Sequence, residues 1–420
     1  MIIRTVTLGC KVNQCESADI VSALQRLNHN ASEGLEPADV YILNTCSVTA
    51  EADKKSRQYI SKMQKLNPQC SIIVVGCSSQ NSTEKFNRPN VIAVGGTHGK
   101  TDFVLSAINQ NFTDNGESTI SDRVLYCEND VRISQNSTKT RDFIKIQDGC
   151  DRFCNYCIIP YLRGRCKSEP VQKIIESIKR SKSKEIVLTG IDMSSYGKDT
   201  GSSLTELLRT LSRFKDVRKR LGSLECEVVS EELLTVMIDG NYCPHFHLSL
   251  QSGNDEVLKS MNRRYTTALY MEKVELIRKF FPLAAITTDV IVGYPTESDE
   301  YFDSSVQFME NCRFADIHVF PYSNRAGTLA SKKYRTLDPE IVSQRVERLL
   351  TVKRRAKSDF AENNIGTVAE VYTEEPSGNY NVGYSTNYLK VYSHSPCGMI
   401  SQLILTEPYL DGIIGIAPEQ

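Results

Sequence analysis

Short apolar runs alternate with polar or amphipathic stretches along the first 125 residues. The apolar runs predict strands at residues 3–8, 40–43, 72–75 and 91–94. Between them, segments such as 16–27 and 54–66 repeat their apolar positions with the spacing of a helix. Strands that alternate with helices are typical of a doubly wound parallel sheet, so the pattern predicts a small N-terminal α/β domain.

A second series of strands and helices follows the polar stretch 128–141, which has no apolar periodicity and is expected to be a linker. Its strands are predicted at residues 143–147, 185–188, 221–224, 246–250, 287–292 and 317–320. Helical patterns lie between them at residues 171–181, 204–214, 231–238 and 271–281. Six such units joined by right-handed crossovers form either a partial barrel or an open sheet, and the pattern alone does not choose between the two.

The pattern changes again near the C-terminus. Residues 339–362 have the apolar spacing of one long helix. Residues 366–420 then alternate apolar and polar positions, with Gly, Pro, Asn and Ser at the breaks. Short strands separated by turn residues predict a small C-terminal β-barrel.

Composition narrows the class of protein. With 420 residues, of which 40% are hydrophobic and 24% charged, the chain is long enough for two or three domains and is predicted to be globular. It has no apolar run of the roughly 18 residues that a membrane span requires, and its first residues lack the pattern of a signal peptide. Disorder, membrane insertion and export are therefore disfavoured, and we expect a cytoplasmic protein.

Fourteen cysteines in a long chain from a reducing compartment indicate metal or redox chemistry rather than disulfides. Cys150, Cys154 and Cys157 form the spacing Cys-x3-Cys-x2-Cys directly after a predicted strand. Three close thiolates can hold three irons of a 4Fe–4S cluster and leave the fourth iron open to a small molecule. Zinc or chance spacing is the alternative, but zinc sites usually combine paired Cys-x2-Cys halves into four ligands.

Three further cysteines are far apart in the sequence, yet each one ends a predicted strand. They are Cys10, Cys46 and Cys77, in TVTLGC, YILNTC and IVVGC. The carboxyl ends of parallel strands lie on one edge of a sheet, so these thiols are expected to meet there. A second metal cluster is the prediction, although cysteines are also often buried simply as small apolar residues.

The spacing of Cys150, Cys154 and Cys157 resembles that of radical S-adenosylmethionine enzymes, and further motifs resemble the methylthiotransferases among them. These motifs are TLGCKVNQ, NTCSVT, VVGC, FHLSLQSG, MNRRYT, TTDVIVGYPTE and PYSNRAGT, and they span essentially the whole chain. LGCKVNQ and QDGCDRFCNYCIIPY are most similar to the bacterial branch that acts on threonylcarbamoyladenosine in tRNA.

The resemblance implies an α/β protein with an N-terminal doubly wound parallel sheet, a central partial (β/α)6 radical-SAM barrel and a small C-terminal antiparallel β-barrel. The implied parts are an N-terminal methylthiotransferase domain at 1–127, a linker at 128–141, a radical-SAM core at 142–335, a basic connecting helix at 336–362 and an RNA-binding-like β-barrel at 363–420.

The resemblance also implies the reaction. A methylthio group is added to carbon 2 of N6-threonylcarbamoyladenosine next to the anticodon, and this unactivated carbon requires a radical. The cluster at Cys150, Cys154 and Cys157 would bind and reduce S-adenosylmethionine and is the catalytic site. An auxiliary 4Fe–4S cluster at Cys10, Cys46 and Cys77 would supply or carry sulfur. Implied partners are the tRNA anticodon loop, an electron donor such as flavodoxin or ferredoxin, and a sulfur source. No association with a membrane is implied.

Three residues after strands match the family's cofactor pocket, namely Gly190, Glu225 and Gly293. Glycine permits close approach of the backbone, and a carboxylate can accept hydrogen bonds from ribose hydroxyls. A glycine after a strand is, however, usually just part of a turn and has no role in binding. These three residues are therefore expected to bind S-adenosylmethionine on the strength of the resemblance alone.

Charge is distributed unevenly, although the net charge is only −1. Residues 325–357 carry ten Lys or Arg against three acids, and Arg163, Arg165 and Lys167 add positive charge after the second triad. Phosphate contacts need such a positive surface, but basic runs are usually just solvated helix faces. The predicted barrel has six acids against Lys390, and its six tyrosines are either base-stacking platforms or ordinary cross-strand partners.

Two other functions stay open from the sequence. A methylthiotransferase that acts on a ribosomal protein side chain would have the same fold and clusters, and the acidic barrel is compatible with it. A non-catalytic iron–sulfur protein that binds RNA would need a closed, four-ligand site at Cys150, Cys154 and Cys157.

Overall fold

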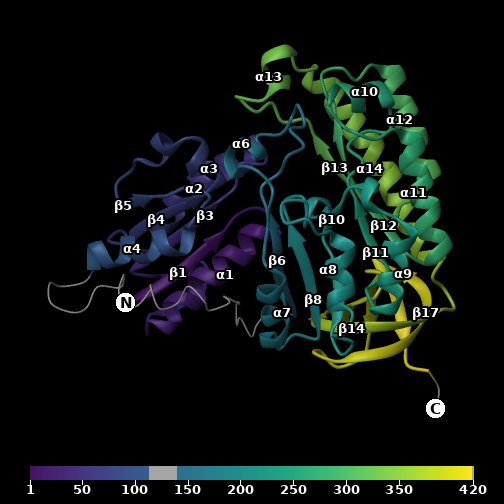
Figure 1. Cartoon of the computed structure of the whole chain (residues 1–420), viewed down its shortest axis with the longest axis horizontal. Helices are drawn as coiled ribbons and strands as arrows, with labels where there is room; N and C mark the ends of the chain where they lie inside the picture. The colour runs from purple at the N-terminus through teal and green to yellow at the C-terminus, as the bar shows by residue number, and fades with distance from the viewer. Residues whose placement is uncertain (113–139, 419–420) are drawn as a thin grey trace. The chain divides into compact units, whose positions relative to one another are not determined.

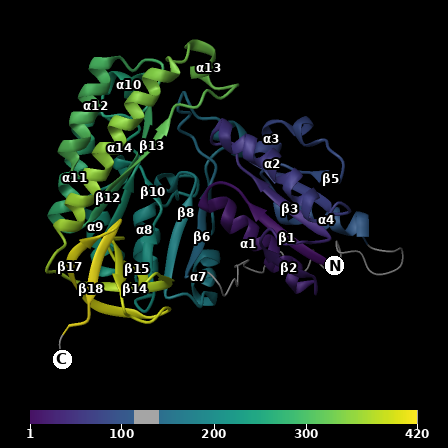
Figure 2. The ribbon, with the colours of Figure 1, turned by 180° about the vertical axis from the view of Figure 1, so that it is seen from behind.

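The structure is a computed structural model, and it describes residues 1–112 and 140–418. The chain forms two compact units. The first contains Met1–Lys182, Thr189–Ile191 and Ser323–Thr328, and the second contains Ser183–Leu188, Asp192–Tyr322 and Leu329–Gln420. The colours of Figures 1 and 2 follow the chain from its purple N-terminus to its yellow C-terminal strands. The predicted linker 128–141 lies outside the described residues except for its last two, and the five-part division stays a prediction.

A parallel sheet forms the centre of the first unit. Its strands are β1 (Ile2–Thr7), β2 (Asn30–Glu33), β3 (Val40–Thr45), β4 (Ser71–Gly76) and β5 (Val91–Val94). Their order, β2-β1-β3-β4-β5, is one of the doubly wound orders, so this part of the predicted fold is confirmed. β2 was not predicted, because its sequence NASE has no apolar alternation; it joins the sheet through backbone pairing with β1.

Alternation along the strands builds a core on each face of this sheet. Ile42 packs in the core with helices α1 (Lys11–Arg26) and α4 (Lys100–Phe112), whereas Leu43 packs with α2 (Ala50–Leu66). Figure 1 shows α1 and α4 side by side on one face of the sheet. Because both faces are covered, the central strands β3 and β4 are apolar along most of their length.

The rest of the first unit carries the second cysteine triad. Its elements are β6 (Arg141–Asp148), α6 (Ile159–Arg163), β7 (Lys167–Ser168) and α7 (Val171–Arg180). β7 pairs antiparallel with the end of β6, so the segment between them returns to its own starting point. α1 packs against β6, which brings the N-terminal sheet to the base of this loop.

The second unit continues the alternation of strands and helices. β8 (Glu185–Gly190), whose last residues belong to the first unit, pairs parallel with β9 (Arg218–Leu221). A four-stranded parallel sheet follows, formed by β10 (Ser223–Leu224), β11 (His245–Leu248), β12 (Ala285–Val292) and β13 (Asp316–Pro321). The strand predicted at 221–224 is therefore two strands, separated by Gly222.

Helices alternate with these strands. They are α8 (Leu204–Leu211), α9 (Glu231–Asp239), α10 (Asp255–Ser260), α11 (Thr267–Phe280), α12 (Asp299–Cys312), α13 (Leu329–Lys333) and α14 (Pro339–Glu362), with short 3-10 turns at Met193–Ser195 and Cys226–Val228. Ser203, Ser230 and Ser298 each accept a backbone N–H bond at a helix start, which explains why α8, α9 and α12 begin where they do. α14 packs on β13 and α12, as both views of the ribbon show.

The last strands of the described chain close into a barrel. They are β14 (Val368–Ser377), β15 (Tyr380–Ser385), β16 (Lys390–Ser393), β17 (Ile400–Tyr409) and β18 (Gly412–Ile416). The pairing is antiparallel as predicted, except that β16 and β18 close the barrel in parallel. Ala361 at the end of α14 packs into the barrel core with Val371 and Leu403.

Among the helices of the described residues, none combines the length and the apolar character needed to cross a bilayer.

Candidate functional site

Three cysteines follow three neighbouring strands of the N-terminal sheet. Cys10 caps the start of α1 after β1, Cys46 follows β3, and Cys77 begins the short helix α3 (Cys77–Asn81) after β4. β1, β3 and β4 are paired in parallel, and their registers end the strands at nearly the same level. The three cysteines are therefore brought together at the carboxyl edge of the sheet, where ligands of such folds bind.

Glycines hold the turns that present these cysteines. Gly9 has a φ of +105°, and a Cβ built on it would lie 2.7 Å from the Sγ of Cys46. Gly76 has a φ of +115°, and a Cβ there would lie 2.5 Å from the carbonyl oxygen of Thr45. Only glycine tolerates both the conformation and the close approach.

Burial and neighbouring thiols disfavour the ionised forms of Cys46 and Cys77. Burial is the main cause that raises the pKa of Cys46 to about 11, and Cys10 and Cys77 beside it act in the same direction. Burial also raises the pKa of Cys77. Converging thiolates require a positive group between them, and thiolate sulfur is the usual ligand of iron–sulfur clusters. The donor set therefore fits a metal cluster.

The second cysteine triad lies on the loop between β6 and α6. The N–H of Cys150 donates to the carbonyl oxygen of Gly164 at 3.1 Å, and that of Cys157 donates to Cys154 at 2.9 Å. A Cβ built on Gly149 would lie 2.0 Å from a backbone carbonyl of the segment after α6, so the two ends of the loop are in close contact. Cys154 is buried, whereas Cys150 and Cys157 are half-buried, which fits a cluster open on one side.

The two cysteine-bearing regions are neighbours within the first unit. Cys77 packs with Ile158 and Leu162, which lie just after Cys157. Thr97, in the loop after β5, donates its hydroxyl hydrogen to the carbonyl oxygen of Leu162 at 2.7 Å. Apolar packing and a hydrogen bond thus hold the edge of the N-terminal sheet against the second loop.

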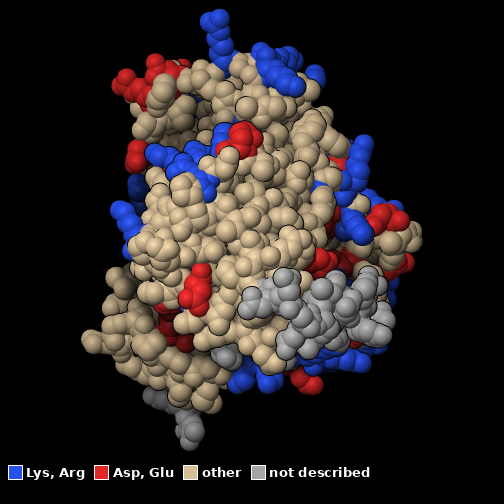
Figure 3. Space-filling model, turned by 90° about the vertical axis from the view of Figure 1, so that its left-hand side faces the viewer, with Lys and Arg blue, Asp and Glu red and all other residues tan. Residues whose placement is uncertain are grey.

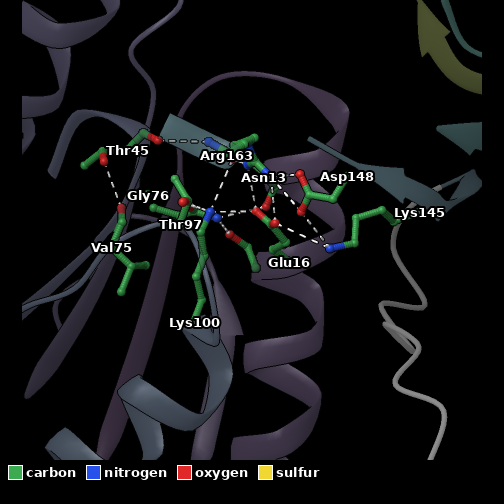
Figure 4. Close-up of polar contacts among 12 residues, drawn as sticks. Asn13, Glu16, Thr45, Val75, Gly76, Thr97, Lys100, Lys145, Asp148 and Arg163 are labelled. Atoms are coloured by element: carbon green, nitrogen blue, oxygen red, sulfur yellow. Dashed lines mark hydrogen bonds and ion pairs between the residues drawn. The ribbon is translucent and has the colours of Figure 1, made fainter. Parts of the chain in front are cut away.

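A buried network of charged side chains joins the same two regions (Figure 4). Arg163, the last residue of α6, donates from Nη1 to Glu16 at 3.0 Å and to Asp148 at 2.8 Å. Its Nη2 donates to the Oδ1 of Asn13 at 2.7 Å. Lys100 Nζ donates to Glu16 at 2.6 Å. The side chains of Arg163, Lys100 and Glu16 are only 1%, 4% and 9% exposed.

This network positions both triads. Asn13 and Glu16 lie on α1, which begins directly after Cys10, whereas Asp148 and Arg163 stand at the two ends of the second loop. A displacement of either segment would break these hydrogen bonds and leave buried charge without its partners, which is costly.

Opposite charges in the network hold each other ionised. Burial alone would raise the pKa of Glu16, but Lys100, Arg163 and Lys145 hold that pKa well below its usual range. Arg163 also opposes the effect of burial on the pKa of Cys77. Its positive charge therefore favours the thiolate form of Cys77 that a cluster requires.

The sequence interpretation of Arg163 as part of a positive surface was wrong. Its side chain is buried in the network, whereas Arg165 is 76% exposed and pairs with Asp151 at 3.1 Å. One signal pointed to the network. Asn13 and Ser17 continue the apolar face of α1 one turn toward its start, so their polar side chains were bound to be buried.

The three residues predicted to bind the cofactor differ in their surroundings. Gly190 ends β8 in the first unit, and the other two belong to the second. Glu225 is buried and pairs with Arg263. Gly293 has a φ of +74°, and its N–H donates to Glu297 at 2.9 Å, as in a tight structural turn. Their binding of S-adenosylmethionine stays a prediction.

The basic segment 325–357 is less positive than its sequence suggests, because half of its ten cations have acidic partners. The pairs are Arg325 with Asp53, Arg345 with Glu297 and Asp299, Arg348 with Asp303, Lys353 with Asp316, and Arg355 with Asp359. Figure 3 shows one face of the molecule, on which Lys and Arg form separate small groups with Asp and Glu among them.

The barrel tyrosines pack on one another. The rings of Tyr380 and Tyr392 lie 5.3 and 5.0 Å from that of Tyr409, and Tyr384 stacks on Tyr388 at 4.8 Å. These contacts favour the role of cross-strand partners.

Two family models match the chain. The model of the Radical SAM superfamily matches residues 144–309, which include Cys150, Cys154 and Cys157. A model described as Uncharacterized protein family UPF0004 matches residues 3–95, which include the cysteines at the edge of the N-terminal sheet.

Curated relatives match nearly the whole chain. A Bacillus subtilis (strain 168) protein named "Threonylcarbamoyladenosine tRNA methylthiotransferase MtaB" is 34% identical over 97% of this chain and 94% of its own length. A protein of the same name from Aquifex aeolicus is 35% identical over 86% of this chain and 90% of its own length. A Fervidobacterium nodosum protein named "tRNA-2-methylthio-N(6)-dimethylallyladenosine synthase" is 33% identical over 90% of this chain and 89% of its own length.

Solved structures agree on the fold. The radical S-adenosylmethionine methyltransferase TsrM from Kitasatospora setae matches with a TM-score of 0.56 and 11% identity, over 79% of this chain and 76% of its own. The cobalamin-dependent S-adenosylmethionine radical enzyme OxsB matches with a TM-score of 0.54 and 12% identity, over 86% of this chain and 56% of its own. The family models and the curated relatives show that the chain belongs to the radical S-adenosylmethionine methylthiotransferases of the MtaB type, transferases that use S-adenosylmethionine and iron–sulfur clusters.

Proposed function

We propose that this chain adds a methylthio group to carbon 2 of N6-threonylcarbamoyladenosine next to the anticodon of tRNA, giving 2-methylthio-N6-threonylcarbamoyladenosine. The observation that carries the proposal is the similarity over 97% of the chain to a relative named for that tRNA substrate. The cytoplasm, where tRNA is modified, is the proposed location.

Each triad has a separate role in this proposal. Cys150, Cys154 and Cys157 hold the cluster that binds S-adenosylmethionine, and the cysteines at the sheet edge hold the auxiliary cluster. When bound, these groups supply the radical and the sulfur that an unactivated aromatic carbon requires. The chain itself fixes the distance between the two triads through Arg163 and Glu16, whose hydrogen bonds join the segments that carry them.

Further residues are proposed to hold the substrates. Gly190, Glu225 and the turn at Gly293 would bind S-adenosylmethionine, with Arg263 holding the Glu225 carboxylate in place. Lys332 and Lys333, on α13, are exposed and would contact tRNA phosphates. An anticodon-loop adenosine is unpaired, so it can leave its stack at a small cost and reach the reacting centre. A flavodoxin or ferredoxin would deliver electrons, and a separate sulfur source would restore the auxiliary cluster.

Nucleoside mass spectrometry tests the substrate. tRNA from a strain that lacks the gene should lose the methylthio form and accumulate N6-threonylcarbamoyladenosine, and the wild-type gene should restore the product. The variants C10A and C150A should fail to restore it. C397A, which removes an exposed barrel cysteine, should restore it fully and serves as the matched control.

A second tRNA substrate is favoured by one observation, because relatives at 33% identity are named for N6-dimethylallyladenosine. The same spectra separate the two, since loss of the methylthio form of dimethylallyladenosine alone would select that substrate. If both modified nucleosides remain unchanged, tRNA is not the substrate, and the methylthiolation of ribosomal proteins should be measured next.

A further inference from the structure

Two histidines and an aspartate lie together on one face of the β10–β13 sheet, and neither cysteine triad involves them. His247 is on β11, Asp289 on β12 and His318 on β13. The register pairs His247 with Thr287 and Asp289 with His318. Thr287 and Asp289 are two residues apart on β12, so their side chains point to the same face. Strand pairing alone therefore brings the three groups together.

The nitrogen and oxygen atoms of this group converge. One ligand atom from each of His247, Asp289 and His318 lies within 4.8 Å of the other two. The Nε2 of His247 is 3.3 Å from the Oδ2 of Asp289, and the centroids of the two imidazole rings are 5.5 Å apart. The separation between His247 and Asp289 matches that of two ligand atoms on one tetrahedral ion, about 3.3 Å. The side chain of His318 is exposed, so it can rotate and bring its ring nitrogen to the same ion.

A neighbouring hydroxyl orients one of the ligands. The Nδ1 of His247 lies 2.9 Å from the Oγ1 of Thr287, and this hydrogen bond fixes the ring with Nε2 toward Asp289. A second hydrogen bond on the remote ring nitrogen is typical of histidines that ligate metals. The nearby cation Lys353 does not compete for Asp289, because it pairs with Asp316 at 3.0 Å.

We propose that His247, Asp289 and His318 form a binding site for a divalent transition-metal ion, with zinc as the ion that the ligand set fits. Two imidazoles and one carboxylate are a frequent ligand set for such ions. Three protein ligands leave a coordination position open, so the bound ion keeps a water molecule or takes an oxygen of another molecule. The site lies in the second unit, whereas both cysteine triads lie in the first, and the proposal does not depend on the identity of the tRNA substrate.

Metal counting on the holoenzyme tests the site. The protein, with both clusters assembled anaerobically, is dialysed against buffered zinc, and zinc and iron are counted in the same sample by mass spectrometry. The wild type should hold one zinc per chain more than H318A and D289N, with equal iron in all three. H394A removes an exposed histidine of the barrel and should keep the zinc, which makes it the matched control.

X-ray absorption at the zinc edge identifies the ligands. Nitrogen and oxygen neighbours at about 2.0–2.1 Å support the site. Sulfur neighbours at about 2.3 Å would mean that zinc has entered a cysteine triad, and the proposal would then be wrong. Equal zinc in the wild type, H318A and D289N would also overturn it, whatever the variants do to methylthio transfer. Circular dichroism on each variant checks that the variant is folded, so that a loss of zinc cannot be due to unfolding.

Discussion

At Gly9 the backbone passes so close to Cys46 that no side chain fits between them. We expect G9A to push Cys46 out of place and to cost the auxiliary cluster, so that iron falls from about eight to about four per chain. Iron and sulfide analysis after anaerobic reconstitution measures this.

The control for G9A is G99A, in the same unit. Gly99 also has a positive φ, +56°, but a Cβ there meets nothing within 4 Å. G99A should therefore keep its full iron content. Equal iron loss in both variants would mean that backbone strain, and not the contact with Cys46, is responsible.

Glu16 is the anion between three buried or half-buried cations, and its removal should destabilise the first unit. E16Q leaves Lys100 and Arg163 without their shared charge partner inside the protein. We expect a loss of about 3–5 kcal/mol in the free energy of unfolding at pH 7. Urea denaturation followed by circular dichroism measures it, with E51Q, an exposed glutamate of the same unit, as the control.

The same carboxylate makes stability depend on pH. Its pKa is depressed in the folded protein, so its contribution is present above the unfolded pKa of about 4.3 and is lost as pH falls below that value. Protonated Glu16 resembles glutamine. The gap in unfolding free energy between the wild type and E16Q should therefore stay constant from pH 7 to pH 5 and shrink at lower pH. A gap that does not narrow would contradict the assignment.

Among the elements, the short helix α6 contributes to both cysteine-bearing regions. Leu162 of this helix and Ile158 just before it pack against Cys77, and Arg163 at its end lies in the buried network. The carboxyl edge of the N-terminal sheet is therefore completed by an element that lies far away in the sequence.

Loss of the Arg163 charge should make the auxiliary cluster harder to reduce. In a C150A background, which leaves the auxiliary cluster as the reporter, R163M should lower its midpoint potential by on the order of 60 mV, a tenfold change for one electron. Redox titration followed by electron paramagnetic resonance measures this shift. R163K should recover part of it, and R165M, at an exposed arginine, should leave the potential unchanged. An unshifted R163M would show that Arg163 acts only on folding.

Across the whole molecule, only part of the basic segment 325–357 is available to RNA, because acidic side chains pair with five of its ten cations. The exposed Lys332 and Lys333 on α13 are the better candidates for phosphate contacts. Each phosphate contact that is lost lowers the salt dependence of binding by about one unit of the logarithmic slope.

The double variant K332Q/K333Q should therefore bind tRNA more weakly and with a salt slope smaller by about two. Filter binding at several salt concentrations measures both quantities. R348Q removes a cation that pairs with Asp303 and should leave the slope nearly unchanged. Equal slopes in all three proteins would place the RNA contacts elsewhere on the molecule.

The sequence by itself predicted most of the strands, the fold class and the convergence of Cys10, Cys46 and Cys77 at one sheet edge. Strands such as β3 and β4 are apolar because both of their faces are buried. The result is a short run of consecutive apolar residues, which can be recognised in the sequence. Cys10, Cys46 and Cys77 were predictable as a group because parallel strands must end on one edge. β2 was missed for the converse reason, since an edge strand held by backbone hydrogen bonds needs no apolar side chains.

Only the tertiary structure decided which charges are buried and which side chains from distant segments meet. Arg163 lies 147 residues from Glu16 in the sequence, and no local pattern distinguishes it from the exposed Arg165. His247, Asp289 and His318 likewise come together through the register of three strands, and a shift of one residue would turn them to opposite faces. Periodicity records which face of an element is apolar, whereas the pairing of distant polar groups depends on register and packing that the local pattern does not contain.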